Sequence, residues 1–460
     1  MEDRARGTSA TSGVPSPGEL ARQLIRFDTA APGGRERELI EWLAPQLEAA
    51  GLDVRVLARD PERPNIVARL RGRGEAPPLL FHGHVDVVPV TGQKWSVDPF
   101  AGEVRDGVLW GRGSLDMKGG VAMLLAAVLR AAAGPPPAGD LILCVLSDEE
   151  QGGALGALFL VEEHAELFAG VRHAIGEFGG FSFPMIGKRV YPIQVAEKQR
   201  AVVRLLAEGD AGHGALGGPG SAVTALAQST RRIGKTGLPV HVTPVAGRML
   251  DDMAAAVGSP LGSVVRALGN ERISGTVLRT LGDRADAIGP MLRNTATVTH
   301  LAAGDREAIN VVPAEAEANL DCRVLPGYGP DDLLAELRPL LAAGVRAEVV
   351  LFERADPAVD WSLYPLLARL LADADPTGHP VPMLLAGVTD GRHFARLGIQ
   401  HHGFLPMQLP PELRFQSLLH AADERVPLAA LDFGADILTR LLAEYPGGSE
   451  AMVPQSGVRS

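Results

Sequence analysis

The sequence predicts an α/β protein in which a doubly wound domain is interrupted by a second, smaller domain. Helical stretches with an apolar face alternate with short strands from about residue 18 onward. Strands such as residues 141–147 are apolar throughout, which is typical of a sheet covered by helices on both faces. The rhythm of the elements changes near Glu197 and returns near Pro357, so we expect the second domain to be inserted into the first.

The elements of the first domain follow from its hydrophobic periods. Residues 18–27 and 36–51 repeat apolar residues at helical spacing, and Gly51 ends the second helix. Apolar runs predict strands at residues 53–58, 65–70, 78–88 and 141–147, and a buried helix at residues 121–134. Beyond residue 357, a helix at residues 362–374 and a strand at residues 398–406 resume the same alternation.

The inserted domain has a different order of elements. In chain order we expect strand 199–209, helix 221–234, a helical insertion at 238–289, strands 295–304 and 309–326, helix 331–344 and strand 346–354. Without the insertion the order is β-α-β-β-α-β, which is ferredoxin-like. The predicted boundaries are a disordered tail at 1–17, the first domain at 18–196 and 357–445, the inserted domain at 197–356, and a disordered tail at 446–460.

Composition and charge exclude several classes of partner. The chain has 44 Lys and Arg against 55 Asp and Glu, a net charge of −11, and no basic block. We therefore expect no binding to nucleic acid or membranes, and favour small-molecule substrates. Cys144 and Cys322 lie in apolar runs and predict buried free thiols. No stretch has the pattern of a signal peptide or membrane span, so we expect a cytoplasmic protein.

Polar residues with metal-binding chemistry follow the predicted strands. His84 and Asp86 stand on the same side of strand 78–88, where Asp86 could take the second N–H of a metal-bound imidazole. Alone, this pair is more typical of a solvated strand end. Asp116 lies in a Gly-rich loop before the buried helix, where its carboxylate could either ligate a metal or cap the helix.

A run of acids, Asp148, Glu149 and Glu150, directly follows strand 141–147, at the edge where open α/β sheets bind ligands. Adjacent carboxylates repel one another, and a cation would compensate that repulsion. Glu177 also follows an apolar strand, and His420 lies in a polar segment near the C-terminus. Taken singly, each of these two is typical of a surface or structural residue.

Combined, these residues indicate a metal centre. Two histidines and three carboxylates form a mixed N/O ligand set that suits Zn²⁺: His84, Asp116, Glu150, Glu177 and His420. One carboxylate can bridge two ions, which leaves each ion one histidine and one further carboxylate. Glu149 is then free to act as general base on a metal-activated water.

The sequence closely resembles the M20 family of zinc amidohydrolases and peptidases. The matching segments are HGHVDVVP, GRGSLDMKGG, SDEEQGG, GEFGG, AEKQRAVVRLLAEGDAGHGA, NVVPAEAEANLDCRVLPG, GVTDGRHF and HAADERVP. They run in family order from residue 82 to residue 427. The insertion at 238–289 and the segment RVYPIQVAEK are most similar to the carboxypeptidase S branch of the family.

The resemblance implies roles for particular residues. It implies two Zn²⁺ per subunit, with Co²⁺ or Mn²⁺ as alternatives, and Asp116 as the ligand that bridges them. His84 and Glu177 would bind one ion, and Glu150 and His420 the other. Asp86 would orient His84, and Glu149 would be the base. For the substrate, the resemblance implies that His213 polarises the scissile carbonyl, often in the active site of the other subunit. Asn310 and Arg323 would bind the substrate carboxylate. Gly387 and Thr389 would line the pocket. The inserted domain would be a lid through which a homodimer forms.

The expected activity is hydrolysis of an amide or peptide bond beside a free carboxylate, on an N-acyl amino acid or a short peptide. Whether the chain is an N-acyl-amino-acid amidohydrolase, a dipeptidase or a carboxypeptidase stays open. The segment after His213 departs from the family pattern, since Ala215 and Leu216 stand where serines or a proline are common. Without the resemblance, His213 would be assigned to a surface turn. The alternatives are a degenerate binding protein of the same fold and a metal-dependent phosphoesterase.

Overall fold

The computed structural model describes residues 13–216, 220–282, 288–355 and 358–445. The chain divides into two compact units, of which unit 1 comprises Met1–Gln194, Asp360–Val381 and Thr389–Ser460, and unit 2 comprises Val195–Val359 and Pro382–Val388. The predicted tails at 1–12 and 446–460 lie outside the described residues. The N-terminal tail was expected to extend to residue 17, but Ser16 caps a helix that begins at Pro17.

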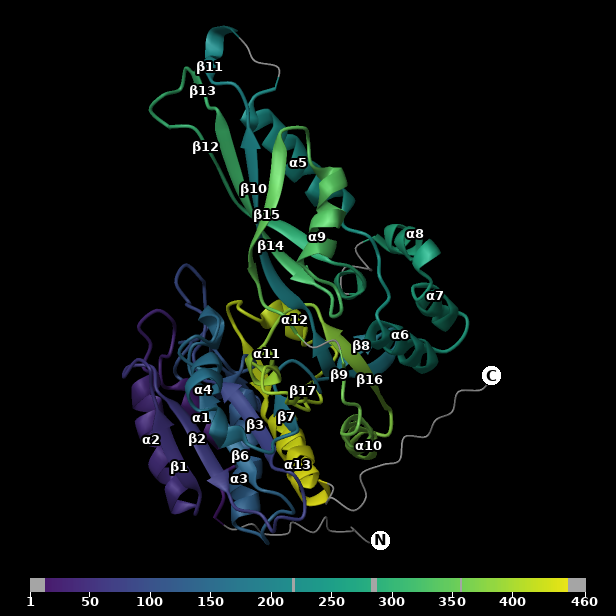
Figure 1. Ribbon diagram of the computed structural model, residues 1–460. Helices are drawn as coiled ribbons and strands as arrows, with labels where there is room; N and C mark the ends of the chain where they lie inside the picture. The colour runs from purple at the N-terminus through teal and green to yellow at the C-terminus, as the bar shows by residue number, and fades with distance from the viewer. Residues whose placement is uncertain (1–12, 217–219, 283–287, 356–357, 446–460) are drawn as a thin grey trace. The chain divides into compact units, whose positions relative to one another are not determined.

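Unit 1 is built on a mixed sheet of nine strands in the order β1-β2-β6-β3-β7-β17-β9-β16, with β8 paired to β9 (Figure 1). The strands are β1 (Asp53–Leu57), β2 (Asn65–Leu70), β3 (Leu79–His84), β6 (Leu141–Leu146), β7 (His173–Gly176), β8 (Phe183–Met185), β9 (Lys188–Glu197), β16 (Gly378–Leu385) and β17 (Gln400–Gly403). The central pairs β6–β3, β3–β7 and β7–β17 are parallel. The carboxyl ends of these four strands therefore lie at one edge of the sheet.

Helices cover both faces of this sheet. The helices of unit 1 are α1 (Pro17–Ile25), α2 (Glu36–Ala49), α3 (Lys118–Ala132), α4 (Ala157–Glu163), α10 (Tyr364–Ala374), α11 (Gly391–Ala395), α12 (Phe415–Leu418) and α13 (Leu428–Glu444). Strand β3 shows the two faces, because Leu80 belongs to a core cluster with residues of α4 and α11, whereas Gly83 faces α3. A Cβ at Gly83 would lie 2.5 Å from Met117 Cε, so only glycine allows this close approach.

A small three-stranded sheet joins two loops of unit 1 that are far apart in sequence. Its order is β18-β5-β4, formed by β18 (Arg425–Pro427), β5 (Val108–Trp110) and β4 (Glu103–Arg105). Arg425 pairs with Trp110, and the Gly111 N–H donates to the Glu424 carbonyl at 2.9 Å. This pairing places the segment after His420 beside the loop that contains Asp116.

Unit 2 contains a four-stranded antiparallel sheet in the order β12-β14-β10-β15. Its strands are β10 (Gln199–Glu208), β12 (Thr295–Ala303), β14 (Glu315–Val324) and β15 (Val345–Phe352), and its helices are α5 (Ala222–Thr236), α6 (Pro244–Val257), α7 (Leu261–Ala267), α8 (Glu271–Leu281) and α9 (Pro330–Leu337). Helices α5 and α9 lie against one face of the sheet in Figure 1, and their apolar residues share a core with β10 and β14. Helices α6 to α8 form the helical insertion that the sequence predicted.

Several elements differ from the sequence-based expectation. The predicted strand 309–326 is divided into β13 (Val311–Val312), which pairs with β11 (Gly212–His213), and β14. Pro313 stands at the break, where it has no N–H to donate to a ladder. Helix 331–344 is shorter than predicted, because α9 ends at Leu337 and a 3-10 turn follows. Strands β9 and β16 were not predicted.

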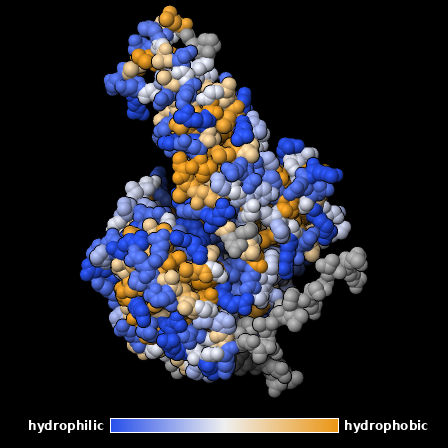
Figure 2. Space-filling view, in the orientation of Figure 1, coloured by the Kyte–Doolittle hydropathy of each residue, from blue (hydrophilic) through white to orange (hydrophobic). Residues whose placement is uncertain are grey.

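Cys144 and Cys322 are buried free thiols, as the sequence predicted. Among the described residues, none of the helices combines the length and the hydrophobicity that crossing a bilayer requires. Figure 2 shows hydrophobic atoms at the end of unit 2 that carries β11 and β13. Leu216 and Ile309 are 86% and 93% exposed there, which is unusual for large apolar side chains.

Candidate active site

The candidate site lies at the edge of the unit 1 sheet where the parallel strands end. His84 is the last residue of β3 and pairs in register with Leu146, the last residue of β6. Glu149 and Glu150 begin the short 3-10 helix η1 (Glu149–Gln151) that follows β6, and Glu177 directly follows β7. Strands of one polarity therefore bring these side chains to the same edge, as the sequence predicted for open α/β sheets.

Asp116 lies between the two histidines. Its Oδ1 is 3.3 Å from His84 Nε2, and its Oδ2 is 3.2 Å from His420 Nε2. The alternative role as a helix cap is absent, because α3 begins at Lys118 after Met117, without a side-chain capping bond. Each oxygen of one carboxylate thus faces a different imidazole, which is the arrangement expected of a ligand that bridges two cations.

Two groups of ligand-type side chains share Asp116. One group is His84, Asp116 and Glu177, and the other is Asp116, Glu150 and His420; within each group the ligand atoms lie within 4.8 Å of one another. Glu177 Oε2 is 3.6 Å from His84 Nε2, and Glu150 Oε1 is 3.3 Å from His420 Nε2. The structure therefore brings together all five residues that the sequence indicated as metal ligands.

The chemistry of these groups fits divalent cations. Within the described part of the chain, His84 Nε2 and Glu150 Oε1 are buried without a hydrogen-bond partner. Burial alone would lower the pKa of His84, but the carboxylates of Asp116 and Glu177 outweigh it and raise that pKa well above its usual range. The nearby carboxylates of Asp116 and Glu150 raise the pKa of His420 to about 10. The carboxylates thus stabilise positive charge in the site, and bound cations can supply that charge in place of protons on the histidines.

Glu149 lies beside these groups without belonging to either. Its Oε2 is 4.0 Å from His84 Nε2. Burial, followed by the charge of Glu177, raises the pKa of Glu149 well above the usual range of a carboxylic acid. A buried carboxyl with a raised pKa next to a metal centre is suited to accept and return a proton.

Asp86 holds a different position from the one the sequence predicted. β3 ends at His84, and the His84 Nδ1–H donates to the backbone carbonyl of Asp86 at 2.9 Å, while the Asp86 carboxylate is 3.6 Å away. That carboxylate instead accepts the backbone N–H groups of Glu149 and Glu150, each at 3.1 Å. The main chain of Asp86 therefore fixes the imidazole, and its side chain fixes the turn that carries the two glutamates.

The three consecutive acids point in different directions, which reduces their mutual repulsion. Asp148 accepts a hydrogen bond from Arg63 at 2.8 Å and one from the Leu155 N–H at 2.9 Å, facing away from the ligand groups. Arg63 also pairs with Glu36 and lies 3.7 Å from the Asp86 carboxylate. Arg63 thus neutralises part of the acidic cluster from behind, and no local pattern in the sequence indicated this role.

A second ion pair supports the Asp116 loop. Glu424, fully buried, accepts hydrogen bonds from Arg112 Nη1 at 2.6 Å and from the N–H groups of Gly113, Leu115 and Asp116. Neither Glu424 nor Arg112 was predicted as a site residue. The available signal was that Arg112 lies in the segment GRGSLDMKGG and Glu424 in the segment HAADERVP, which also contains His420.

Thr389 is buried in unit 1, and its hydroxyl accepts the Gly391 N–H at 3.1 Å, whereas Gly387 belongs to unit 2. Asp390, the next residue of the loop expected to line the pocket, is buried, and neither carboxylate oxygen has a hydrogen-bond partner among the residues that the structure describes. Burial raises the pKa of Asp390 to about 7, even though the charges of Arg392 and His84 oppose the shift. The negative charge of Glu177 also raises the pKa of Asp390.

The remaining predicted substrate residues lie in unit 2. His213 is exposed in β11, opposite Val311 of β13, and its Nδ1 accepts the Ala215 N–H at 3.2 Å. The neighbouring Asn310 is exposed, and its carbonyl accepts the Gly214 N–H at 2.8 Å. Arg323 lies on β14, where Nε donates to Asp321 at 3.3 Å and Nη1 is buried without a hydrogen-bond partner in the described ranges.

Comparison with known proteins decides the family. Residues 80–444 match Peptidase family M20/M25/M40. The chain belongs to this family. All five predicted ligands, and Glu149 as well, lie inside the matched residues, and the resemblance to the M20 family is confirmed.

The M20 relatives share moderate identity over most of the chain. The human N-fatty-acyl-amino acid synthase/hydrolase is 27% identical over 79% of this chain and 73% of its own length. The succinyl-diaminopimelate desuccinylase of Cereibacter sphaeroides is 27% identical over 93% of this chain and 98% of its own length. Such coverage means that the likeness extends through both units.

Solved M20 structures share the fold. A metallo-carboxypeptidase from Sulfolobus solfataricus superposes with a TM-score of 0.67 at 17% identity, covering 94% of this chain and 99% of the other. Human carnosine dipeptidase 1 gives a TM-score of 0.61 at 15% identity, covering 93% and 96%. As an M20 member, this chain is a metal-dependent hydrolase of peptide or related amide bonds.

Proposed function

We propose that the M20 site of this chain holds two divalent cations and hydrolyses an amide bond beside a free carboxylate. Asp116 would bridge the cations, with His84 and Glu177 completing one site and Glu150 and His420 the other. The observation that supports this assignment most directly is the placement of the two Asp116 oxygens, 3.3 Å and 3.2 Å from the two imidazoles. No other carboxylate of the described residues belongs to both ligand groups.

Zn²⁺ is the proposed ion, with Co²⁺ or Mn²⁺ as substitutes that the same ligands accept. Mixed imidazole and carboxylate ligands suit a borderline cation. When bound, such ions polarise a carbonyl group and make water a stronger acid. The His84 Nδ1–H bond to the Asp86 carbonyl leaves Nε2 as the free ligand atom, which is the tautomer a metal requires.

Glu149 is the proposed general base. It would take a proton from the attacking water as the new C–O bond forms, and return that proton to the leaving amine as the C–N bond breaks. Its raised pKa suits both halves of this transfer at neutral pH. The Asp86 carboxylate holds the Glu149 backbone N–H at 3.1 Å and so fixes the position of the base.

For unit 2 we propose a ferredoxin-like lid and dimerisation domain. The strand order β15-β10-β14-β12 and the chain order β-α-β-β-α-β support this assignment once α6 to α8 are set aside.

His213 would donate a hydrogen bond to the carbonyl oxygen of the substrate, in its own or the partner subunit. Arg323 would bind the substrate carboxylate, with support from its unpartnered Nη1, and Asn310 would assist it. Gly387 and Thr389 would line the pocket.

A homodimer is part of this proposal. The apolar side chains of Leu216 and Ile309 are exposed beside β11 and β13, and β12 is an edge strand. Association would bury the apolar surface and cover the edge. Sedimentation equilibrium should give twice the chain mass. A monomer with full activity would refute this part of the proposal.

The names of several relatives support the substrate class that we propose. These relatives include a desuccinylase and an N-fatty-acyl-amino acid hydrolase, and a structural neighbour is a dipeptidase. We propose an N-acyl amino acid or a short peptide as substrate. The test is a panel of N-succinyl, N-acetyl and N-fatty-acyl amino acids and dipeptides, incubated with enzyme loaded with Zn²⁺, Co²⁺ or Mn²⁺. Each compound is paired with its carboxamide. Turnover of the carboxamides at the rate of the free acids would refute selection of the carboxylate.

A further inference from the structure

A cavity of about 990 Å³ lies within unit 2, between the C-terminal end of α5, helix α8, the turn η5 (Gly289–Leu292) and α9. This volume lies in the upper range of small-molecule pockets. The helical insertion α6 to α8 supplies one of its walls. All the lining residues that the structure describes belong to unit 2, and none of the proposed metal ligands is among them.

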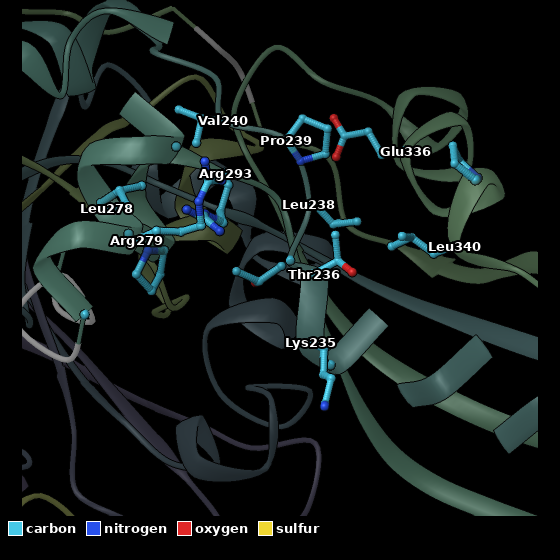
Figure 3. A pocket seen from close by; sticks show the side chains of 18 residues that line it. Lys235, Thr236, Leu238, Pro239, Val240, Leu278, Arg279, Arg293, Glu336 and Leu340 are labelled. Atoms are coloured by element: carbon cyan, nitrogen blue, oxygen red, sulfur yellow. The ribbon is translucent and has the colours of Figure 1, made fainter. Parts of the chain in front are cut away.

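Two guanidinium groups stand at one end of the cavity. Figure 3 shows Arg279 of α8 beside Arg293, which directly follows η5, while Glu336 of α9 lies on the opposite side. Burial and the charge of Arg279 both lower the pKa of Arg293, so the two cations are close enough to repel each other. Lys235, a third cation of the lining, points away from this pair in Figure 3.

The described residues supply no negative partner for the pair. Arg293 Nε is buried without a hydrogen-bond partner in the part of the chain that the structure describes, and Arg279 Nη2 donates only to the Thr276 hydroxyl at 3.0 Å. Glu336 is the one carboxylate of the described lining, and it is already engaged by His241 at 2.6 Å and Asn294 at 3.1 Å. Two converging cations without a counter-ion cost free energy, and an anion would remove that cost.

Apolar side chains also line the cavity, beside the polar residues Thr236 and Thr295. Leu238, Pro239, Leu278 and Leu340 supply apolar surface, with Leu278 on the side of the guanidinium groups and Leu340 on the opposite side in Figure 3. Gly237 leaves room for Arg293, because a Cβ there would lie 2.8 Å from Arg293 Nη1. The cavity thus combines a charged end with apolar walls, as sites for amphipathic small molecules do.

We propose that this cavity binds a small organic molecule that carries an oxyanion, a carboxylate or a phosphate, on an apolar body. Arg279 and Arg293 bind the oxyanion, for which the planar guanidinium offers paired N–H donors. The apolar walls hold the organic part. The site is separate from the metal centre, and the proposal does not depend on the proposed function.

The test measures binding of phenyl phosphate, phenylacetate and inorganic phosphate to the metal-loaded full-length enzyme by titration calorimetry. We expect Arg293→Gln and Arg279→Gln each to weaken one binding event for both phenyl anions at least tenfold, about 1.4 kcal/mol. Comparing the affinities of phenyl phosphate and phenylacetate shows whether the site prefers a phosphate or a carboxylate. Inorganic phosphate, which lacks an apolar body, should bind this site at least tenfold more weakly, and equal affinity for all three probes would overturn the role of the apolar walls.

Arg272→Gln is the matched control, because Arg272 is exposed on the same helix α8 and does not line the cavity. It removes one positive charge and should leave binding unchanged. Because Arg279 is exposed, we expect Arg279→Gln to fold normally, so this variant still tests the site if Arg293→Gln misfolds. Any anion held at the metal centre binds all four proteins alike, and none of the three substitutions should change the hydrolysis rate. Identical titrations for the wild type and all variants would overturn the proposal.

Discussion

Glu424 accepts the backbone N–H of Asp116 at 3.1 Å, although the two residues are 308 positions apart in the chain. The same carboxylate accepts Arg112 Nη1 at 2.6 Å, and both side chains are buried. The residue that bridges the two ligand groups is therefore held from behind by a buried charge. Because Glu424 follows His420 within one short segment, it also ties the position of His420 to that of Asp116.

Glu424→Gln should lower both stability and metal affinity. Glutamine keeps the shape but offers one acceptor oxygen in place of two and leaves Arg112 without a countercharge. Breaking a buried pair in this way costs about 3–5 kcal/mol of unfolding free energy. Urea unfolding of the metal-free protein measures the loss, and a chelator competition measures the metal affinity. The control is Asp436→Asn, which removes the exposed partner of Arg130 and should cost less than about 1 kcal/mol.

Glu149→Gln should separate catalysis from metal binding. The substitution preserves the backbone hydrogen bond to Asp86 and removes the proton acceptor, so kcat should fall by at least about 10² while two metal ions per subunit remain. Elemental analysis and initial rates measure the two effects. Glu150→Ala, one residue further on, and His420→Ala should instead reduce the bound metal. Full activity of Glu149→Gln would show that another group is the base.

Metal affinity should rise with pH. In the metal-free protein, the carboxylates of Asp116 and Glu150, which accept from the His420 ring, raise the pKa of His420 to about 10, so the imidazole carries a proton at neutral pH. A cation must displace that proton, and each displaced proton makes the Kd fall about tenfold per pH unit below the pKa. Chelator competition at pH 6, 7 and 8 measures this slope. Affinity that does not change over this range would contradict the competition between protons and metal.

His213→Ala should impair turnover without loss of metal. An imidazole that donates to the developing oxyanion contributes about 10²–10³ in kcat, and it should change KM much less. His300→Ala, which removes another exposed histidine of unit 2, serves as the control and should leave kcat unchanged. If His213 acts across a dimer, mixing inactive His213→Ala and Glu149→Ala subunits under exchange should restore activity. Without such recovery, His213 serves its own subunit or has no catalytic role.

Much of the site could be predicted because its residues stand at positions that local patterns identify. His84, Glu149, Glu150 and Glu177 directly end or follow apolar strands, and strands of one polarity bring their ends together. The role of the Asp86 side chain could not be predicted in the same way. The period of two places it on the same side as His84, but β3 ends at His84, and the chain turns before Asp86.

The sequence by itself determined which residue types stand at the strand ends, the alternation of helices and strands, and membership of the M20 family, because these depend on order along the chain. The tertiary structure alone decided which groups hold those residues. Glu424 and Arg63 contact their partners across long stretches of sequence, through side-chain bonds to buried backbone and to carboxylates. Such contacts leave no periodic signal. The contact of Glu424 arises only when β18 pairs with β5, which brings it beside the loop of Asp116.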